Sequence, residues 1–199
     1  LLRCLVLCYR PLHDRGRWHV GGNQVVPPRR PVIGVMGASE ASSQSLASAR
    51  ELGTLLARRG WIVLTGGRPE GVMAAASAGA KQVPGSLTLG ILPGTAGGTG
   101  PDVDIAVFTG MGEARNMINV LTSDVVIACG VEGAGTVSEV ALALKAEKPV
   151  ILLAAGSAAR ELFGGMGGRL LTAATAEEAV HLIEAQLRIA PWRGGPDLP

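Results

Sequence analysis

Short apolar runs alternate with longer amphipathic segments along the chain from residue 31 onward. Six of the apolar runs predict strands, because each is aliphatic along its length and ends at glycine, proline or a polar residue. Strands that are apolar throughout must bury both of their faces, which is typical of a parallel sheet covered by helices on both sides. The predicted strands cover residues 31–37, 61–67, 87–94, 104–110, 124–129 and 149–155.

The segments between most of these strands carry apolar residues three and four positions apart, which predicts helices. In the first of them Leu52 and Leu56 share one face, and Gly60 provides a natural stop. In the last one Thr175 and Glu178 have the spacing of a capping box at a helix start. The predicted helices cover residues 42–60, 71–82, 113–123, 135–147 and 175–190.

The alternation of strands and helices predicts a single α/β domain with a doubly wound, Rossmann-like parallel sheet. We expect this domain to span residues 31–190, since no repeat or linker divides it. Residues 1–30 have no regular periodicity and end in prolines and arginines, so we expect an irregular basic N-terminal extension, disordered or loosely attached. A targeting peptide is the alternative for this segment. Residues 191–199 form a polar, proline-bounded tail.

Composition narrows the function classes. The 199 residues are 47% hydrophobic and 17% charged, which fits a globular domain with an aliphatic core. Six arginines and one aspartate give residues 1–30 a local charge of +5, so the rest of the chain is near −3 within a total of +2. A mildly acidic body argues against a nucleic-acid-binding surface, and no apolar run approaches the roughly 20 residues that cross a membrane.

Cysteine use indicates a reducing compartment. Cys4, Cys8 and Cys129 are an odd, scattered set without the spacing of a metal site. Such a set is more typical of an intracellular protein than of a disulfide-bonded one. We therefore expect a cytoplasmic location and no metal ligands.

Glycine marks the loops that follow the first five predicted strands. In doubly wound sheets, ligands bind beyond the carboxyl ends of the strands, where loops lead into helix starts. Five glycine-bearing loops at one edge of the sheet therefore predict a shared ligand site, although the small-residue helix after the second strand is explained equally well by close packing. The candidate ligand contacts in the first four loops are Gly37, Ser39, Gly66, Gly67, Gly71, Met73 and Gly112.

The loop after the fifth strand is the strongest candidate for binding an anion. Its sequence, GVEGAGT at residues 130–136, opens a helix whose unpaired N–H groups and positive dipole end favour a phosphate. Gly133 and Gly135 let an oxygen approach the backbone, and Thr136 adds a hydroxyl donor. Glu139 projects on the same side as Thr136, since the two are three residues apart. The simpler alternatives are a tight strand-to-helix turn and a favourable acid in a first helical turn.

Arg115 stands at the start of the helix predicted for residues 113–123. An arginine there opposes the helix dipole, so local stability does not explain its position. A guanidinium suits phosphate or carboxylate, which it binds through two parallel hydrogen bonds. The alternative is an exposed arginine or one paired with Glu113.

Four segments, in this order, resemble a known superfamily. They are TGGRPEGVM, GILPG, GMGEARNMINVLTSDVVIACG and GAGTVSEVALALKAEKPVI. The resemblance is to the nucleotide-binding superfamily that contains the LONELY GUY-type phosphoribohydrolases, long labelled lysine decarboxylases. Within it, the chain looks more similar to the branch typified by the molybdenum cofactor carrier protein. The likeness covers about residues 31–189.

The resemblance implies roles for several residues. Gly133, Gly135, Thr136 and Glu139 match the later positions of the hydrolase signature P-G-G-x-G-T-x-x-E. Arg115 matches the arginine that precedes this signature. In the hydrolases, that arginine and that glutamate are the catalytic pair, and they cleave the N-glycosidic bond of a nucleoside 5′-monophosphate.

Three departures from the hydrolase pattern resemble the carrier branch. Asn116 replaces a lysine, Gly130 or Val131 stands where a proline is expected, and Glu132 lies in a run that is one residue longer. A carboxylate within about 5 Å of a phosphate costs on the order of 1 kcal/mol. We therefore expect either that Glu132 points away or that the ligand is not a simple nucleotide monophosphate.

The resemblance implies a protein that binds a phosphate-bearing small molecule, either molybdenum cofactor or a nucleotide monophosphate, and carries it unchanged. The alternative is a phosphoribohydrolase in which Arg115 and Glu139 are catalytic and no further cofactor is required. The five loops contain no lysine, which argues against a pyridoxal-dependent decarboxylase. The small-residue helix and the likeness also lead us to expect a homo-oligomer, a dimer or a tetramer, with neither nucleic acid nor a membrane as partner.

Overall fold

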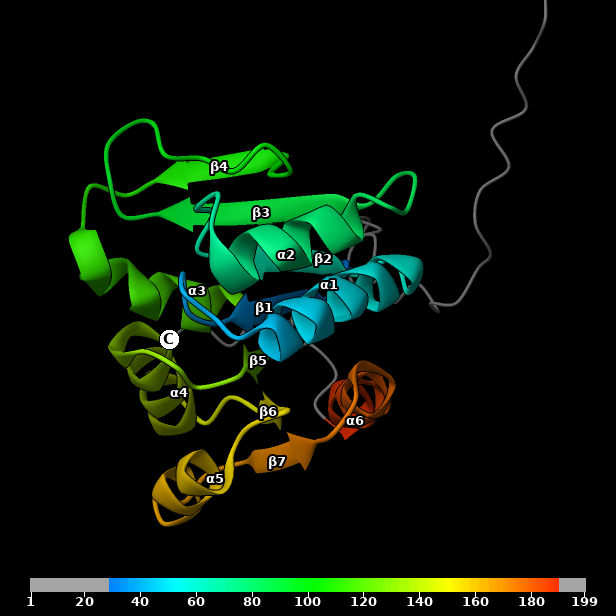
Figure 1. Cartoon of the computed structure of the whole chain (residues 1–199), viewed down its shortest axis with the longest axis vertical. Coiled ribbons are helices and arrows are strands. Elements are labelled where there is room, and N and C mark those ends of the chain that lie inside the picture. The colour runs from blue at the N-terminus through cyan, green and yellow to red at the C-terminus, as the bar shows by residue number, and fades with distance from the viewer. Residues whose placement is uncertain (1–28, 190–199) are drawn as a thin grey trace, which may run out of the picture.

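Seven parallel strands form one sheet in the computed structural model, which describes residues 29–189 (Figure 1). The strand order is β4-β3-β2-β1-β5-β6-β7, and every neighbouring pair is parallel. The winding direction therefore reverses between β1 and β5. The strands are β1 (Val32–Met36), β2 (Ile62–Thr65), β3 (Leu87–Leu92), β4 (Ile105–Phe108), β5 (Val125–Cys129), β6 (Val150–Leu153) and β7 (Leu170–Ala173).

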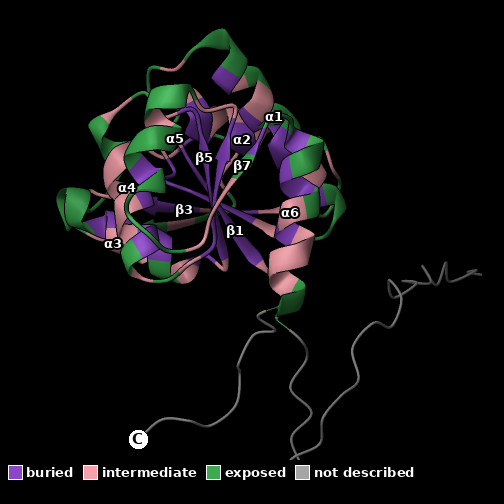
Figure 2. Cartoon of the chain, turned by 90° about the horizontal axis from the view of Figure 1, so that it is seen from below, coloured by how far each residue is buried: buried purple, intermediate pink, exposed green. Residues whose placement is uncertain are grey.

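Helices cover both faces of this sheet. Figure 2 shows the buried strands surrounded by helices whose exposed residues face outward. One layer consists of α1 (Ser43–Arg58), α2 (Gly71–Ala80) and α6 (Ala176–Ile189), and the other of α3 (Asn116–Thr122), α4 (Ala134–Lys145) and α5 (Ser157–Gly164). The doubly wound, Rossmann-like fold that the sequence predicts is confirmed.

The first strand shows why the sheet needs both layers. All five residues of β1 are buried, and successive side chains of a strand point to opposite faces. Ile33 and Val35 pack in the core cluster shared with α1, α2 and α6, whereas Val32 and Met36 pack in the cluster shared with α3, α4 and α5. Each buried aliphatic side chain stabilises the fold by about 1.5–3 kcal/mol relative to an exposed one. The central strands therefore anchor the loops that follow them.

The small residues of α2 serve packing against α1. A Cβ atom at Gly53 of α1 would overlap the carbonyl oxygen of Ala76, and one at Gly79 of α2 would overlap that of Arg50. The two helices thus touch through their backbones, which glycine alone permits. Of the two explanations for this small-residue segment, close packing accounts for these positions.

Two elements, α5 and β7, are not predicted by the sequence pattern. Phe163 is the one buried residue of α5, and Ala173 is the one buried residue of β7. Neither element therefore has the apolar periodicity that marks the others. The helix predicted for residues 113–123 begins as a 3-10 turn, η1 (Gly112–Arg115), before α3. No helix in the described part of the chain is long and apolar enough to span a membrane.

The two predicted terminal segments lie almost entirely outside the described residues. Within them, Arg29 and Arg30 are described. Arg29 forms an ion pair with Asp124, which precedes β5. Arg30 Nε donates to Gly60 O, which precedes β2, at 2.6 Å. These two arginines therefore bind to the amino-terminal edge of the sheet, away from the predicted ligand site.

Candidate functional site

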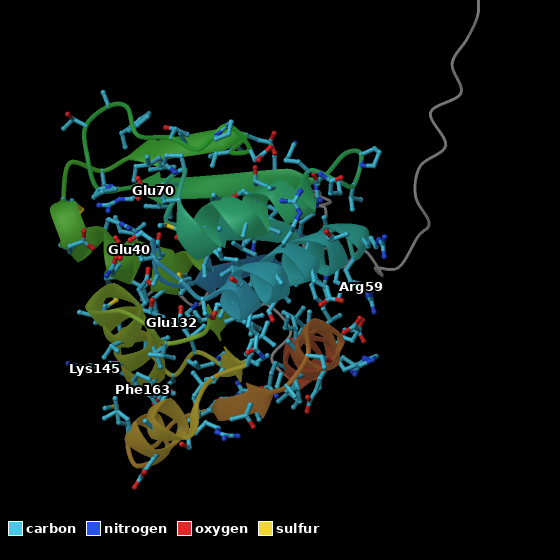
Figure 3. All side chains as sticks on the ribbon, viewed as in Figure 1. Glu40, Arg59, Glu70, Glu132, Lys145 and Phe163 are labelled. Atoms are coloured by element: carbon cyan, nitrogen blue, oxygen red, sulfur yellow. The ribbon has the colours of Figure 1, made fainter. Side chains whose placement is uncertain are left out.

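A cavity of about 310 Å³ lies beyond the carboxyl ends of β1, β2 and β5, between the loops that follow these strands and the start of α3. It occupies the point where the winding of the sheet reverses, which is the usual ligand position in doubly wound folds. Figure 3 shows Glu40 and Glu132, from the loops after β1 and β5, at this end of the sheet beside α3 and α4. The fold thus brings several of the predicted loops to one cavity.

The start of α4 borders this cavity without a side-chain cap. Gly133 is the N-cap residue, with extended backbone (φ −160°, ψ 156°) and no side chain to bind the first N–H groups. Ala134, Gly135 and Thr136 follow it in the cavity lining. Thr136 is 2% exposed, and its Oγ1 has no hydrogen-bond partner within residues 29–189. Free main-chain donors, a buried hydroxyl and the positive end of a helix dipole suit an anion.

The neighbouring helix start, that of α1, is capped by Ser42 Oγ, which accepts from Ser45 N, and a carboxylate of the protein contacts the same two serines. Glu132 Oε2 accepts from Ser42 N at 3.0 Å, and Glu132 Oε1 accepts from Ser45 Oγ at 3.0 Å. Burial raises the pKa of Glu132, but the hydrogen bonds from Ser42 and Ser45 outweigh it, so the pKa lies below its ordinary value. Glu132 borders the cavity, yet its carboxylate contacts the start of α1 and not the first turn of α4.

Arg115 and Glu139 meet inside the cavity lining. Arg115 Nη1 lies 3.8 Å from Glu139 Oε1, and both side chains are buried. The same carboxylate oxygen accepts a hydrogen bond from Asn119 Nδ2 at 2.8 Å. Arg115 Nε has no partner in the described part of the chain. The arginine therefore faces Glu139, and its Nε is a buried donor without a partner among the described residues.

Burial controls the protonation of this pair. It raises the pKa of Glu139, and the hydrogen bond from Asn119 and the charge of Arg115 reduce this effect without cancelling it. Burial also lowers the pKa of Arg115, although a guanidinium remains charged at neutral pH. Glu139 is thus the titratable member of the pair, and Arg115 is a permanent positive charge next to the start of α4.

The glycines of the first two loops bring α2 against the loop after β1. A Cβ atom at Gly37 would lie 2.5 Å from Val72 Cγ2, and one at Gly71 would overlap the carbonyl oxygen of Ala38. Gly71 also has a φ of 57°, which favours glycine. Val72 N donates to Ala38 O at 3.1 Å and closes the contact. These contacts fix one wall of the cavity.

Most of the predicted ligand contacts belong to this cavity. Nine of the twelve line it: Gly37, Ser39, Gly66, Met73, Arg115, Gly133, Gly135, Thr136 and Glu139. The other three shape the surrounding loops. Gly67 packs against Gly90 with a φ of 74°, Gly71 supports the loop after β1, and Gly112 N donates to Pro93 O at 3.0 Å. That any of the twelve binds a ligand stays a prediction.

Several lining residues carry no mark of function in the sequence. Glu40 borders the cavity without any motif to distinguish it. Glu113, considered above only as a partner of Arg115, also borders the cavity and pairs with Arg68 instead. Asn116, noted above only because it replaces a lysine, also lines the cavity. Asn119 holds Glu139 from one helical turn further along α3. The one signal for Asn119 is its three-residue spacing from Asn116.

Comparison with known proteins identifies the family. Residues 30–182, more than half of the chain, match the sequence profile of the SLOG cluster4 family. The chain belongs to the SLOG cluster4 family.

Solved structures similar to this SLOG cluster4 protein confirm the resemblance to the carrier branch. The present chain is 50% identical to the molybdenum cofactor binding protein from the phototrophic bacterium Rippkaea orientalis. The alignment covers 79% of this chain and 97% of that one, with a TM-score of 0.76. The chain is 44% identical to the molybdenum cofactor carrier protein of Chlamydomonas reinhardtii, covering 80% and 99%, with a TM-score of 0.75. A curated, uncharacterized protein of Archaeoglobus fulgidus is 42% identical over 121 residues, which are 61% of this chain and 78% of that protein.

Proposed function

We propose that this SLOG cluster4 protein binds molybdenum cofactor through its phosphate and carries it unchanged. The observation that carries the proposal is the convergence, at one cavity, of the uncapped start of α4, the Thr136 hydroxyl and the Arg115 guanidinium. Two similar proteins are named for binding or carrying this cofactor, are 44–50% identical, and are covered over 97–99% of their lengths. This coverage supports the same ligand for the present chain.

The free donors suit a phosphate monoester. Such a group carries a charge of about −1.5 to −2 at neutral pH, so hydrogen bonds to it are charge-assisted and stronger than neutral ones. The first N–H groups of α4, Thr136 Oγ1 and Arg115 Nε all lack side-chain partners among the described residues. Since Thr136 and Arg115 are buried, water competes little for them.

The surroundings of Glu139 favour carriage over hydrolysis. Its Oε1 is engaged by Asn119 and faces Arg115. Burial raises its pKa, which disfavours the ionised carboxylate that would stabilise an oxocarbenium-like centre. Asn116 also stands where the hydrolases have lysine. Cleavage of a nucleoside 5′-monophosphate is therefore the alternative to be excluded by experiment.

Retention of the cofactor tests the proposal. The purified full chain is mixed under anoxic conditions with molybdenum cofactor released from a molybdoenzyme, and the cofactor retained on ultrafiltration is quantified by mass spectrometry. We expect saturable retention by the wild type. Arg115→Met, which keeps the stem and removes the charged donors, should weaken it roughly 10- to 100-fold, because hydrogen bonds to charged groups contribute about 1.5–3 kcal/mol. Arg58→Met, at an exposed position in the last turn of α1, is the matched control.

Two results would contradict carriage. Absence of cofactor retention by the wild type overturns the proposal directly. In parallel, the protein is incubated with AMP, and free adenine is followed by chromatography. Turnover that disappears in Glu139→Ala would assign phosphoribohydrolase activity instead.

We also propose that the protein is a homo-oligomer in contact through the free edge of the sheet. In the described structure β4 pairs only with β3, and Ile105, Val107 and Phe108 are 40–47% exposed. An apolar edge strand is a template for pairing with another chain. Light scattering should give a multiple of 20.3 kDa, and Val107→Lys should shift the mass toward the monomer. A wild type that is monomeric at every concentration contradicts this proposal.

A further inference from the structure

One buried polar atom of the cavity is a hydrogen-bond acceptor, unlike the donors proposed for the phosphate. Asn116 lines the cavity and is 4% exposed. Its Nδ2 donates to Ser138 Oγ at 2.9 Å, whereas its Oδ1 accepts no hydrogen bond from any residue in the range 29–189. A buried acceptor without a donor costs about 1–3 kcal/mol. At the wall of a ligand cavity, such an atom indicates a donor on the ligand.

The neighbours of Asn116 fix the orientation of its amide. Ser138 Oγ donates its single hydrogen to Gly135 O at 2.7 Å, because a carbonyl oxygen can only accept. Ser138 can therefore only accept from Asn116, which places Nδ2 at Ser138 and leaves Oδ1 for the ligand. Gly135 belongs to the anion-binding turn of α4. Two hydrogen bonds thus tie this acceptor to the turn.

We propose that Asn116 determines ligand specificity by accepting a hydrogen bond from an N–H or O–H group that adjoins the phosphate. The inference rests on the proposed function, since it takes the start of α4 as the phosphate site. It narrows the ligand class to phosphate monoesters whose neighbouring part presents a donor. The ring N–H groups of the pterin in molybdenum cofactor meet this requirement, whereas inorganic phosphate has no such neighbouring part.

The charges around the cavity suit the same class. Its lining contains two arginines and four glutamates: Arg68, Arg115, Glu40, Glu113, Glu132 and Glu139. A carboxylate accepts hydrogen bonds and does not donate them. Three of these carboxylates already face donors of the protein: Glu132 faces Ser42 and Ser45, Glu139 faces Asn119, and Glu113 faces Arg68. Glu40 is therefore the lining carboxylate that is left, beside Asn116 Oδ1, to accept from an N–H or O–H group of the ligand.

Three variants separate ligand recognition from support of the fold. Asn116→Leu removes the acceptor. Ser138→Ala removes the bond that holds the amide but keeps the acceptor. Thr136→Val removes a phosphate donor. Affinity is measured for two probes, molybdenum cofactor under the anoxic conditions above and inorganic phosphate by titration calorimetry, and thermal unfolding monitors the fold of each variant.

The expected signature is selective. Asn116→Leu should weaken cofactor binding about tenfold, the effect of losing one neutral hydrogen bond, and weaken phosphate binding no more than Ser138→Ala does, since both variants lose the bond to the turn. Thr136→Val should weaken the binding of both probes. Ser138→Ala should weaken cofactor binding less than Asn116→Leu does. If the leucine variant unfolds, Asn116→Asp tests the same role, because it is nearly isosteric. It keeps the acceptor oxygens and adds a negative charge. It should therefore weaken phosphate binding more than cofactor binding.

The results separate failure of this inference from failure of the proposed function. If the wild type retains cofactor and Asn116→Leu retains it equally well, the inference is overturned and the proposed function stands. If Asn116→Leu loses both probes in parallel, the asparagine supports the phosphate turn and does not recognise the ligand, which also overturns the inference. If the wild type retains no cofactor, both proposals fail.

Discussion

The guanidinium of Arg115 lies against the backbone of Gly66, just beyond the carboxyl end of β2. A Cβ atom at position 66 would be 2.7 Å from Arg115 Nη1 and 2.7 Å from Met73 Sδ. Glycine therefore allows the arginine at the end of η1 to approach the sheet and to face Glu139. Gly66, predicted as a ligand contact, thus leaves room for the side chain of Arg115, another predicted contact.

Gly66→Ala should weaken ligand binding with little loss of stability. The added methyl group meets the far ends of two flexible side chains, so the guanidinium moves while the backbone stays. We expect affinity for molybdenum cofactor to fall about tenfold, or about 1.4 kcal/mol, in the retention assay. Gly94→Ala is the control, because the nearest atom to its Cβ would be 3.6 Å away. Unchanged affinity in Gly66→Ala would show that Arg115 does not contact the ligand.

Gly135→Ala should stabilise the free protein and impair binding. Apart from the neighbouring backbone of α4 itself, no described atom lies within 4 Å of the added Cβ. Alanine favours a helix over glycine by about 0.5–1 kcal/mol. The same methyl group stands where a phosphate would approach the start of α4. Chemical denaturation and the retention assay measure the two effects. Gly164→Ala, in α5 and equally free of contacts, should bind normally, and normal binding by Gly135→Ala would place the phosphate elsewhere.

Glu139→Gln should make the protein more stable than the wild type near neutral pH, but not near pH 4.5. Burial raises the pKa of Glu139 above 4.5 in the folded chain, so the folded state holds this proton more tightly than the unfolded one. The resulting stabilisation is complete below about pH 4.5 and is lost as pH rises through the folded pKa. The glutamine variant stays neutral, so its melting temperature should exceed that of the wild type near neutral pH and approach it near pH 4.5. A variant less stable than the wild type at neutral pH would mean that the ion pair with Arg115 outweighs burial.

Glu132→Gln should change the pH dependence of stability in the opposite direction to Glu139→Gln. Burial raises the pKa of Glu132, but the hydrogen bonds from Ser42 and Ser45 bring it below 4.5. Its stabilisation is therefore present above pH 4.5 and lost as pH falls through the folded pKa. We expect the variant to lose about 0.3–1 kcal/mol of unfolding free energy at neutral pH, the usual value of a charge at a helix start, and to match the wild type in acid. Coincident denaturation curves at neutral pH would contradict the contact with α1.

The fold was predictable where burial is uniform. Every residue of β1 and β5 is buried, so unbroken aliphatic runs identify these strands. That the two are neighbours, with the switch point between them, follows only from the strand order in the structure. The unpredicted α5 and β7 bury little beyond Phe163 and Ala173, and their sequences therefore lack a periodic signal. An apolar run predicts a strand but not its burial: β4 was predicted to be covered on both faces, yet Ile105, Val107 and Phe108 are exposed at the free edge of the sheet.

The candidate site was predictable in most of its glycines and in Arg115 and Glu139 taken separately, because backbone approach and charge leave traces in local sequence. That these two residues form a pair was implied only by the resemblance. The hydrogen-bond partners of the residues around the site could not be predicted from the sequence. Asn119 holds Glu139 across a contact between α3 and α4, and Glu132 reaches α1 across some 90 positions of sequence. Such partnerships depend on how helices pack, which spacing within one segment does not encode.

The contact between Glu132 and the start of α1 also distinguishes two neighbouring helix starts. Both α1 and α4 begin beside the crevice between β1 and β5, and α1 has a carboxylate of the protein at Ser42 and Ser45. The start of α4 has no such side-chain partner among the described residues. A dinucleotide that needed both helix ends for its pyrophosphate would find one of them already taken.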